Sequence, residues 1–310
     1  MQDYGVSEKA MKEKASSMLS SGEVTRVIGW RKGLFDTDVS PSVFRSASDV
    51  EAEFVYNEWC AANLSKYLIK ESRKVNAEGS IGKILVFLKP CDTYSFTQLL
   101  KEHRIIRENV VAVGVPCDGK KDPEKKELCD KCKVCNKKFI SCDELLFGDE
   151  TYCHGNDESV NPDRFEEVKK LEAMTEDERA AFWSNEFARC IRCNACRNVC
   201  PACSCELCVF DNPNSGVSQK AAVTSFEEEN FHIIRAFHVA GRCTDCGECS
   251  RVCPQNIPLH LLNRKFISDI DKLYGDYEAG SDLETVSPLT FYTKGDSEPS
   301  VAKTLSRGAN

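Results

Sequence analysis

Eight cysteines in the C-terminal half of the chain form two runs with the same spacing. Each run has three cysteines at three-residue steps and a fourth, followed by proline, four residues further on. The runs consist of Cys190, Cys193, Cys196 and Cys200, and of Cys243, Cys246, Cys249 and Cys253. In bacterial two-cluster modules this spacing ligates [4Fe-4S] clusters, and the last cysteine of each run ligates the cluster of the other run. The residue types and spacing therefore predict electron transfer.

Two [4Fe-4S] clusters that exchange their fourth ligands are the expected occupants of the two runs. The first cluster is expected on Cys190, Cys193, Cys196 and Cys253. The second is expected on Cys243, Cys246, Cys249 and Cys200. Zinc is the alternative, because Cys-x-x-Cys pairs also form tetrahedral zinc sites. Three cysteines in one run, with a distant Cys-Pro, favour the clusters.

Arginines lie beside several of these cysteines in the sequence. They could raise a reduction potential, because a positive charge stabilises the reduced and more negative cluster. Ordinary solvated surface charge is the alternative role. The arginines are Arg192, Arg197, Arg242 and Arg251.

A third set of cysteines is predicted in the N-terminal half. Cys91 and Cys117 each follow an apolar stretch, 83–89 or 110–115, that suits a buried strand. Open α/β sheets bind ligands beyond the carboxyl ends of their strands, so these thiols are expected to converge. Cys132 and Cys135 in the next loop would complete four thiolates, with Cys129 as a substitute. The set predicts a third [4Fe-4S] cluster, with zinc or free thiols as alternatives.

The remaining cysteines give weaker indications. A short run, Cys203-x-Cys205-x-x-Cys208, could bind metal or line a compact loop, and its spacing names no fourth ligand. Isolated cysteines are expected to pack as small apolar residues. They are Cys60, Cys142 and Cys153.

Composition bounds the class of protein. The chain has 310 residues, of which 41% are hydrophobic, and this is enough for two domains with cores. A net charge of -8 disfavours nucleic-acid binding, which depends on cationic side chains. The polar N-terminus lacks an apolar export segment, so the reducing cytoplasm is expected. No stretch approaches the roughly 18 apolar residues of a membrane span, so no direct span is expected.

The expected fold class is α+β, with an N-terminal α/β domain followed by a helix-rich ferredoxin-like domain with two [4Fe-4S] clusters. Strand, helix and strand between 83 and 115 indicate a small parallel or mixed sheet. Residues 49–70 are expected to form one helix, and an amphipathic helix should follow Pro258. The chain is expected to begin with an N-terminal arm at 1–24, which is either frayed or rests on a neighbour. The α/β domain with its cysteine metal site follows at 25–160. The ferredoxin-like domain at 161–275 contains the 42-residue insertion 201–242, and a polar tail is expected at 276–310.

Several motifs resemble one known family. Lys89-Pro-Cys-Asp92, Val115-Pro-Cys-Asp-Gly119 and Cys132-x-x-Cys135 followed by Phe147-Gly-Asp149 resemble the beta subunits of deazaflavin-reducing hydrogenases and formate dehydrogenases. The resemblance implies that Cys91, Cys117, Cys132 and Cys135 are iron-sulfur ligands. The two C-terminal runs are similar to formate dehydrogenase beta-type subunits that associate with heterodisulfide reductase-like flavoproteins of electron-bifurcating complexes.

An electron-transfer subunit of an anaerobic oxidoreductase complex is therefore the expected function, with no catalytic residues of its own. It would relay electrons between a flavin-containing or catalytic partner and another redox partner. The partners implied by the resemblance are a heterodisulfide reductase-like flavoprotein and a formate dehydrogenase or hydrogenase catalytic subunit. The alternatives are a subunit that contains FAD and itself reduces or oxidises a deazaflavin-type carrier, and a zinc-stabilised assembly protein. No dinucleotide fingerprint or Walker loop is present in the sequence.

Overall fold

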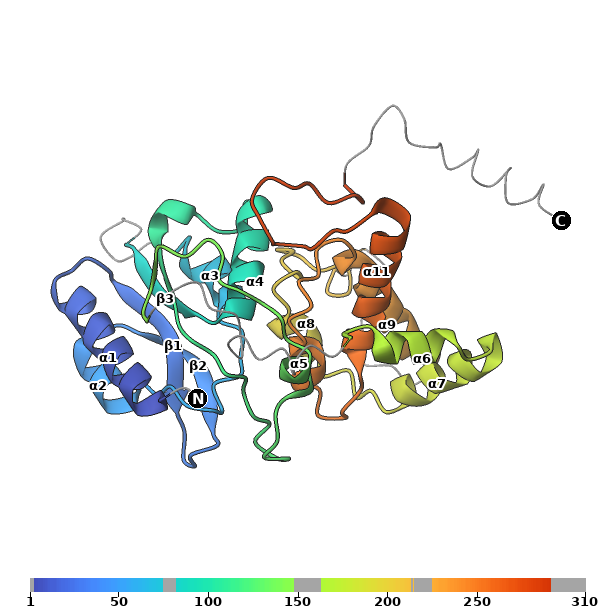
Figure 1. Cartoon of the computed structure of the whole chain (residues 1–310), viewed down its shortest axis with the longest axis horizontal. Helices are drawn as coiled ribbons and strands as arrows, with labels where there is room; N and C mark the ends of the chain where they lie inside the picture. The colour runs from blue at the N-terminus through green and yellow to red at the C-terminus, as the bar shows by residue number, and fades with distance from the viewer. Residues whose placement is uncertain (1–2, 75–81, 148–162, 213, 215–224, 291–310) are drawn as a thin grey trace.

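The computed structural model of the chain describes residues 3–74, 82–147, 163–212, 214 and 225–290. A sheet with helices α1–α4 lies on one side of the molecule, and helices α6, α7, α9 and α11 lie on the other (Figure 1). The short helices α5 and α8 lie between them. Among the described residues, no helix is both long and apolar enough to cross a membrane.

Five strands form one mixed sheet in the order β2-β1-β3-β4-β5. The strands are β1 (Arg26–Lys32), β2 (Val39–Phe44), β3 (Ile84–Leu88), β4 (Val110–Gly114) and β5 (Glu144–Leu145). Strand β2 pairs antiparallel with β1, whereas β1, β3, β4 and β5 are parallel to one another. Leu88 pairs with Gly114, so β3 and β4 end at the same edge of the sheet. The predicted α+β class and mixed sheet are confirmed.

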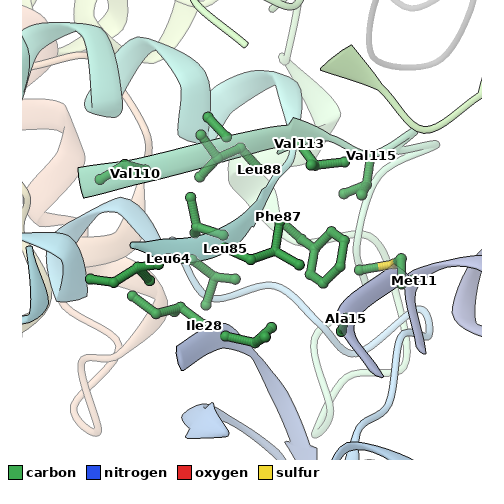
Figure 2. Packing of buried hydrophobic residues seen from close by; sticks show 14 of the residues in the cluster. Met11, Ala15, Ile28, Leu64, Leu85, Phe87, Leu88, Val110, Val113 and Val115 are labelled. Atoms are coloured by element: carbon green, nitrogen blue, oxygen red, sulfur yellow. The ribbon is translucent and has the colours of Figure 1, made fainter. Parts of the chain in front are cut away.

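The sheet core needs cover on both faces, because all five residues of β3 are buried. Figure 2 shows Phe87 of β3 beside Met11 and Ala15 of α1 (Tyr4–Ser20). Both α1 residues are fully buried, so α1 is part of the core, and the expectation of a frayed arm is wrong for this segment. Asp3 caps the helix by accepting a hydrogen bond from the Val6 N–H.

Residues 49–70 form two short helices instead of the single predicted helix. They are α2 (Ala47–Glu53) and α3 (Ser65–Glu71). After α2 the backbone joins the sheet, where the Val55 N–H donates to the Trp30 carbonyl at 2.9 Å. Asn57 then accepts a hydrogen bond from the Trp59 N–H at 2.9 Å. Pairing with a distant strand and this local side-chain bond replace the helical hydrogen bonds.

The segments after β3 and β4 lead to the predicted third site. Helix α4 (Pro90–Lys101) begins two residues after β3 with proline at its first position, which suits a helix start. A 3-10 turn, η1 (Arg107–Asn109), precedes β4. The loop after β4 contains the short helix α5 (Asp130–Lys133).

The second half of the chain is helical in its described parts. Its helices are α6 (Glu166–Glu172), α7 (Glu176–Ala188), α8 (Ala195–Val199), α9 (Ser225–Val239), α10 (Glu248–Arg251) and α11 (Leu259–Tyr274). A separate apolar cluster packs α7, α9 and α11 around the cysteine runs, with Phe187, Phe210, Phe231, Ile257 and Leu259 buried. Helix α6 packs through Val168 and Leu171 against Leu261 of α11. Helix α11 follows Pro258, as predicted.

Residues 276–290 pack against the folded chain, although 276–310 was expected to be a polar tail. Tyr277 and Ala279 are buried together with Ile270 of α11. Gly280 has a φ of +75° and lies so close to α4 that an added Cβ would be 2.1 Å from the Tyr94 carbonyl oxygen. Residues 291–310 lie outside the described part of the chain, as do Cys153, Gly148 and Asp149.

Candidate metal centres

The two cysteine runs fold into the same local shape. In each run, the residue before the second cysteine and the residue after it have positive φ angles. These residues are Arg192 (51°) and Asn194 (61°) in the first run and Asp245 (54°) and Gly247 (65°) in the second. A short helix, α8 or α10, follows each pair. Left-handed residues in such loops form backbone concavities that suit anions, including iron-sulfur clusters.

Backbone N–H groups in these loops point at the thiols. The Arg192 N–H donates to Cys190 Sγ at 3.4 Å, and the Asp245 N–H makes the equivalent bond to Cys243. Burial nevertheless raises the pKa of Cys190 to about 12 and that of Cys249 to about 12. Without metal these thiols hold their protons, so metal binding would release them.

The fourth cysteine of each run lies beside the other run. Burial raises the pKa of Cys196, and Cys253 is the nearby thiol with the largest effect on it. Burial also raises the pKa of Cys246, and there the thiol with the largest effect is Cys200. Cys200 likewise acts on Cys249. These electrostatic contacts place Cys253 near Cys196, and Cys200 near Cys246 and Cys249.

Four thiols from the N-terminal half converge on a single cavity. Its lining includes Cys91, Cys117, Cys132 and Cys135, and also Cys246 of the second run. Cys91 is at the start of α4 and Cys117 follows β4, so the parallel strands deliver both thiols to one edge.

Cys129, the substitute for Cys132 or Cys135, does not line this cavity. It lines a neighbouring cavity with Arg251 and His260. A hydrogen bond between Cys129 and Cys132 lowers the pKa of Cys129. Cys132 and Cys135 line the cavity with Cys91 and Cys117, and Cys129 contacts Cys132 from the neighbouring cavity.

Cationic side chains surround the same cavity. Four lysines and two arginines line it: Lys89, Lys120, Lys131, Lys137, Arg164 and Arg264. Lys120 is fully buried, and this burial lowers its pKa although nearby thiols oppose the shift. Carboxylates pair with all of these cations except Lys120 among the described residues. A group with four thiolate ligands would be negatively charged, so Lys120 is the lining cation that best fits an anionic occupant.

A buried ion cluster joins this cavity to the second cysteine run. Glu248 is fully buried and contacts Lys131 Nζ at 2.5 Å and Arg251 Nη2 at 2.7 Å. Lys131 also donates to the Ala61 carbonyl at 2.7 Å, and Glu248 accepts a hydrogen bond from the Asn63 N–H at 3.2 Å. The loop with Cys132 is thus fixed to the loop with Cys246.

The four arginines singled out from the sequence are each paired with a carboxylate. The pairs are Arg192–Glu228 at 3.1 Å, Arg197–Asp211 at 2.9 Å, Arg251–Glu248 at 2.7 Å, and Arg242–Glu102. These acids offset the positive charge that each arginine brings to its neighbouring cysteine. The effect of these four arginines on the reduction potentials of the clusters is therefore expected to be smaller.

Two groups near the runs have no role assigned by the sequence. His232 Nε2 lies 3.2 Å from Cys190 Sγ, and with Glu228 they bring three potential ligand atoms within 4.8 Å of one another. Burial lowers the pKa of His232 to about 3, so the ring is neutral. No spacing rule connects it with a cysteine 42 residues away.

The short run lines a groove on α8 and α9, with Cys203, Cys205 and Cys208 beside His238.

The comparisons with known proteins agree with this geometry. Residues 186–257 match the 4Fe-4S dicluster domain family, so the chain is an iron-sulfur protein. The predicted resemblance to the beta-subunit family is confirmed by two relatives. The chain is 34% identical over 80 residues to "F420-dependent formate dehydrogenase subunit beta" of Methanocaldococcus jannaschii, covering 26% of this chain and 20% of that one. It is 23% identical over 282 residues to "F420-dependent formate dehydrogenase 1 subunit beta" of Methanococcus maripaludis, covering 62% and 71%.

The match to the first of these relatives spans only a fifth of that protein's length. Among solved structures, the F420-reducing [NiFe] hydrogenase complex from Methanosarcina barkeri is similar over 45% of this chain and 48% of that one, with 16% identity. The TM-score is 0.30, which is too low to support an argument about function.

Proposed function

We propose that the chain is the iron-sulfur electron-transfer subunit of an oxidoreductase complex. The observation that supports the proposal is the match of residues 186–257 to a 4Fe-4S dicluster domain, together with a nearby cavity lined by Cys91, Cys117, Cys132, Cys135 and Cys246. When bound, [4Fe-4S] clusters supply one-electron transfer at potentials between about -700 and +450 mV.

The proposed ligand sets are those predicted from the spacing. One set is Cys190, Cys193, Cys196 and Cys253, the second is Cys243, Cys246, Cys249 and Cys200, and the third is Cys91, Cys117, Cys132 and Cys135. Inward backbone N–H groups support an anionic cluster in each of the two runs, and the lining cation Lys120 supports one in the third cavity. Cys246 belongs to the second set and lines the third cavity, which makes these two sites neighbours.

The proposed complex contains a catalytic oxidoreductase subunit. Both relatives are named as beta subunits of F420-dependent formate dehydrogenases, and this supports a formate dehydrogenase-type catalytic partner. A hydrogenase-type partner and a cytoplasmic location are proposed on the basis of the sequence. A heterodisulfide reductase-like flavoprotein is the proposed second partner, on the basis of the sequence resemblance. Electrons would pass through this chain between the two.

Metal and flavin analysis of anaerobically purified protein tests the proposal. Three clusters predict about twelve irons and as many sulfides per chain, whereas two predict about eight. Zinc in place of iron would overturn the electron-transfer function and favour a zinc-stabilised assembly protein. Stoichiometric flavin would instead favour the alternative in which the chain binds FAD and reacts with a deazaflavin-type carrier.

Single substitutions then test the third set. Cys91→Ser and Cys117→Ser should each remove about four irons and leave the EPR signals of the other clusters. Cys129→Ser is the sharpest control, because Cys129 touches Cys132 but lines a different cavity. Full iron in Cys91→Ser, or equal loss in Cys129→Ser, would contradict the assignment.

A further inference from the structure

Helix α9 buries an arginine among the cysteines of both runs. Arg235 is 2% exposed, and its Nε, Nη1 and Nη2 atoms have no hydrogen-bond partner among the described residues. The helix belongs to the segment that separates the two runs, between Cys200 and Cys243. The guanidinium therefore stays charged in the interior while five N–H donors go unused.

This arrangement sets Arg235 apart from the four arginines paired with carboxylates. Each of those faces a carboxylate at the edge of a run, whereas the groups that act electrostatically on Arg235 are thiols. Burial lowers the pKa of Arg235, but the effects of Cys249, Cys196, Cys200 and Cys203 outweigh it and raise the pKa. Cys196 belongs to one proposed ligand set and Cys249 and Cys200 belong to the other, whereas Cys203 is part of the short run.

An unpaired buried cation is strongly unfavourable unless something negative and hydrogen-bond accepting lies against it. The residues around Arg235 supply sulfur atoms in place of a carboxylate. A cluster with four thiolate ligands provides both the negative charge and additional sulfur acceptors. The orphaned guanidinium is therefore suited to the loaded form of the protein.

We propose that Arg235 is a positioning residue shared by both clusters of the dicluster region, where its guanidinium donates hydrogen bonds to cluster sulfur atoms and raises both reduction potentials. The proposal rests on the proposed function, since it requires clusters in both runs. Hydrogen bonds to sulfur and nearby positive charge stabilise the reduced form. One cation between two sites also ties their potentials to the same residue.

EPR-monitored redox titration of the anaerobically purified full chain tests this. Arg235→Met should retain about eight irons in the dicluster region. Both midpoint potentials should shift to more negative values by at least a tenfold change in the one-electron equilibrium, about 59 mV. Arg235→Lys keeps the charge but lacks the planar fork of donors, so its shift should be smaller.

Arg197→Met is the matched control, because Arg197 directly follows Cys196 but is paired with Asp211, whose side chain is 52% exposed. It should leave both potentials close to those of the wild type. Wild-type potentials in a loaded Arg235→Met variant would overturn the proposal and leave the proposed function intact.

If the Arg235→Met variant loses its iron, the midpoint potentials of the Arg235→Lys variant test the proposal instead. A negative shift in that variant supports the role in setting the potentials, whereas wild-type potentials would make Arg235 a structural residue only. Absence of iron from the wild-type protein would instead refute the proposed function itself.

Discussion

Replacing Glu248 by Gln removes the carboxylate that holds two cations in the interior. Although burial acts to raise the pKa of Glu248, Arg251 and Lys131 outweigh it and hold that pKa well below its ordinary value. The substitution leaves Lys131, whose side chain is 6% exposed, without its carboxylate partner. Breaking a buried pair in this way costs about 3–5 kcal/mol.

Lys131→Met should cost less. Glu248 would keep its two hydrogen bonds from Arg251, at 2.8 and 2.7 Å, and the bond from the Asn63 N–H. The loss is then close to that of one hydrogen bond to a charged group, about 1.5–3 kcal/mol. The double variant should lose less than the sum of the two single losses, because no charge is left unpaired at Lys131.

The unfolding rate at a fixed guanidinium concentration measures these differences. Anaerobic far-UV circular dichroism on samples of equal iron content suits the comparison, since cluster loss makes unfolding irreversible. A cost of 3 kcal/mol corresponds to about a hundredfold faster unfolding if the contact is absent from the transition state.

Glu172→Gln is the control for this series. Glu172 also lies between two cations, Arg179 and Lys265, but its side chain is 36% exposed. Its loss should be below about 1 kcal/mol. An unfolding rate for Glu248→Gln within twofold of the Glu172→Gln rate, or fully additive costs at Glu248 and Lys131, would refute the reasoning.

Two further substitutions test the packing of the sites and the sheet. Gly247→Ala should reduce the iron content measured after anaerobic purification, because the φ of Gly247 is +65° and an added Cβ would lie 2.5 Å from Lys131 Cβ. Gly275→Ala is the control and should retain full iron, because Gly275 also has a positive φ, +88°, but an added Cβ would meet nothing within 4 Å. Met11→Ala should cost about 2–5 kcal/mol, measured by the same unfolding rates, since Met11 is fully buried in the sheet core. Val6→Ala in the same helix, at a position 56% exposed, should cost less than about 0.5 kcal/mol.

The cysteine sites could be predicted because their signals are local or follow from topology. Three-residue steps describe a loop that wraps one cluster, and the loop shape is set within each run. Cys91 and Cys117 converge because β3 and β4 are parallel, and the strand, helix and strand pattern indicates this. The sequence favoured Cys132 and Cys135 with Cys129 as a substitute, and the family resemblance supports the same pair because spacing alone allows either one.

The residues that the sequence did not reveal depend on contacts between distant segments. Arg235 looks like any other arginine on an amphipathic helix until the fold places both cysteine runs against it. Conversely, Arg192 looks available until Glu228, 36 residues later, pairs with it. A helical pattern through Phe54 and Val55 was outweighed by pairing with β1. Tertiary contacts of this kind override local propensity.

The crosswise runs also bear on how the protein is made. Synthesis and folding proceed from the N-terminus, so the sheet and the third cysteine set leave the ribosome before either run. With the proposed ligand sets, the nascent chain cannot complete the second site before Cys249 or the first before Cys253. These two sites can therefore be completed with iron only after the sheet and α9 have left the ribosome, when most of the chain has been synthesised.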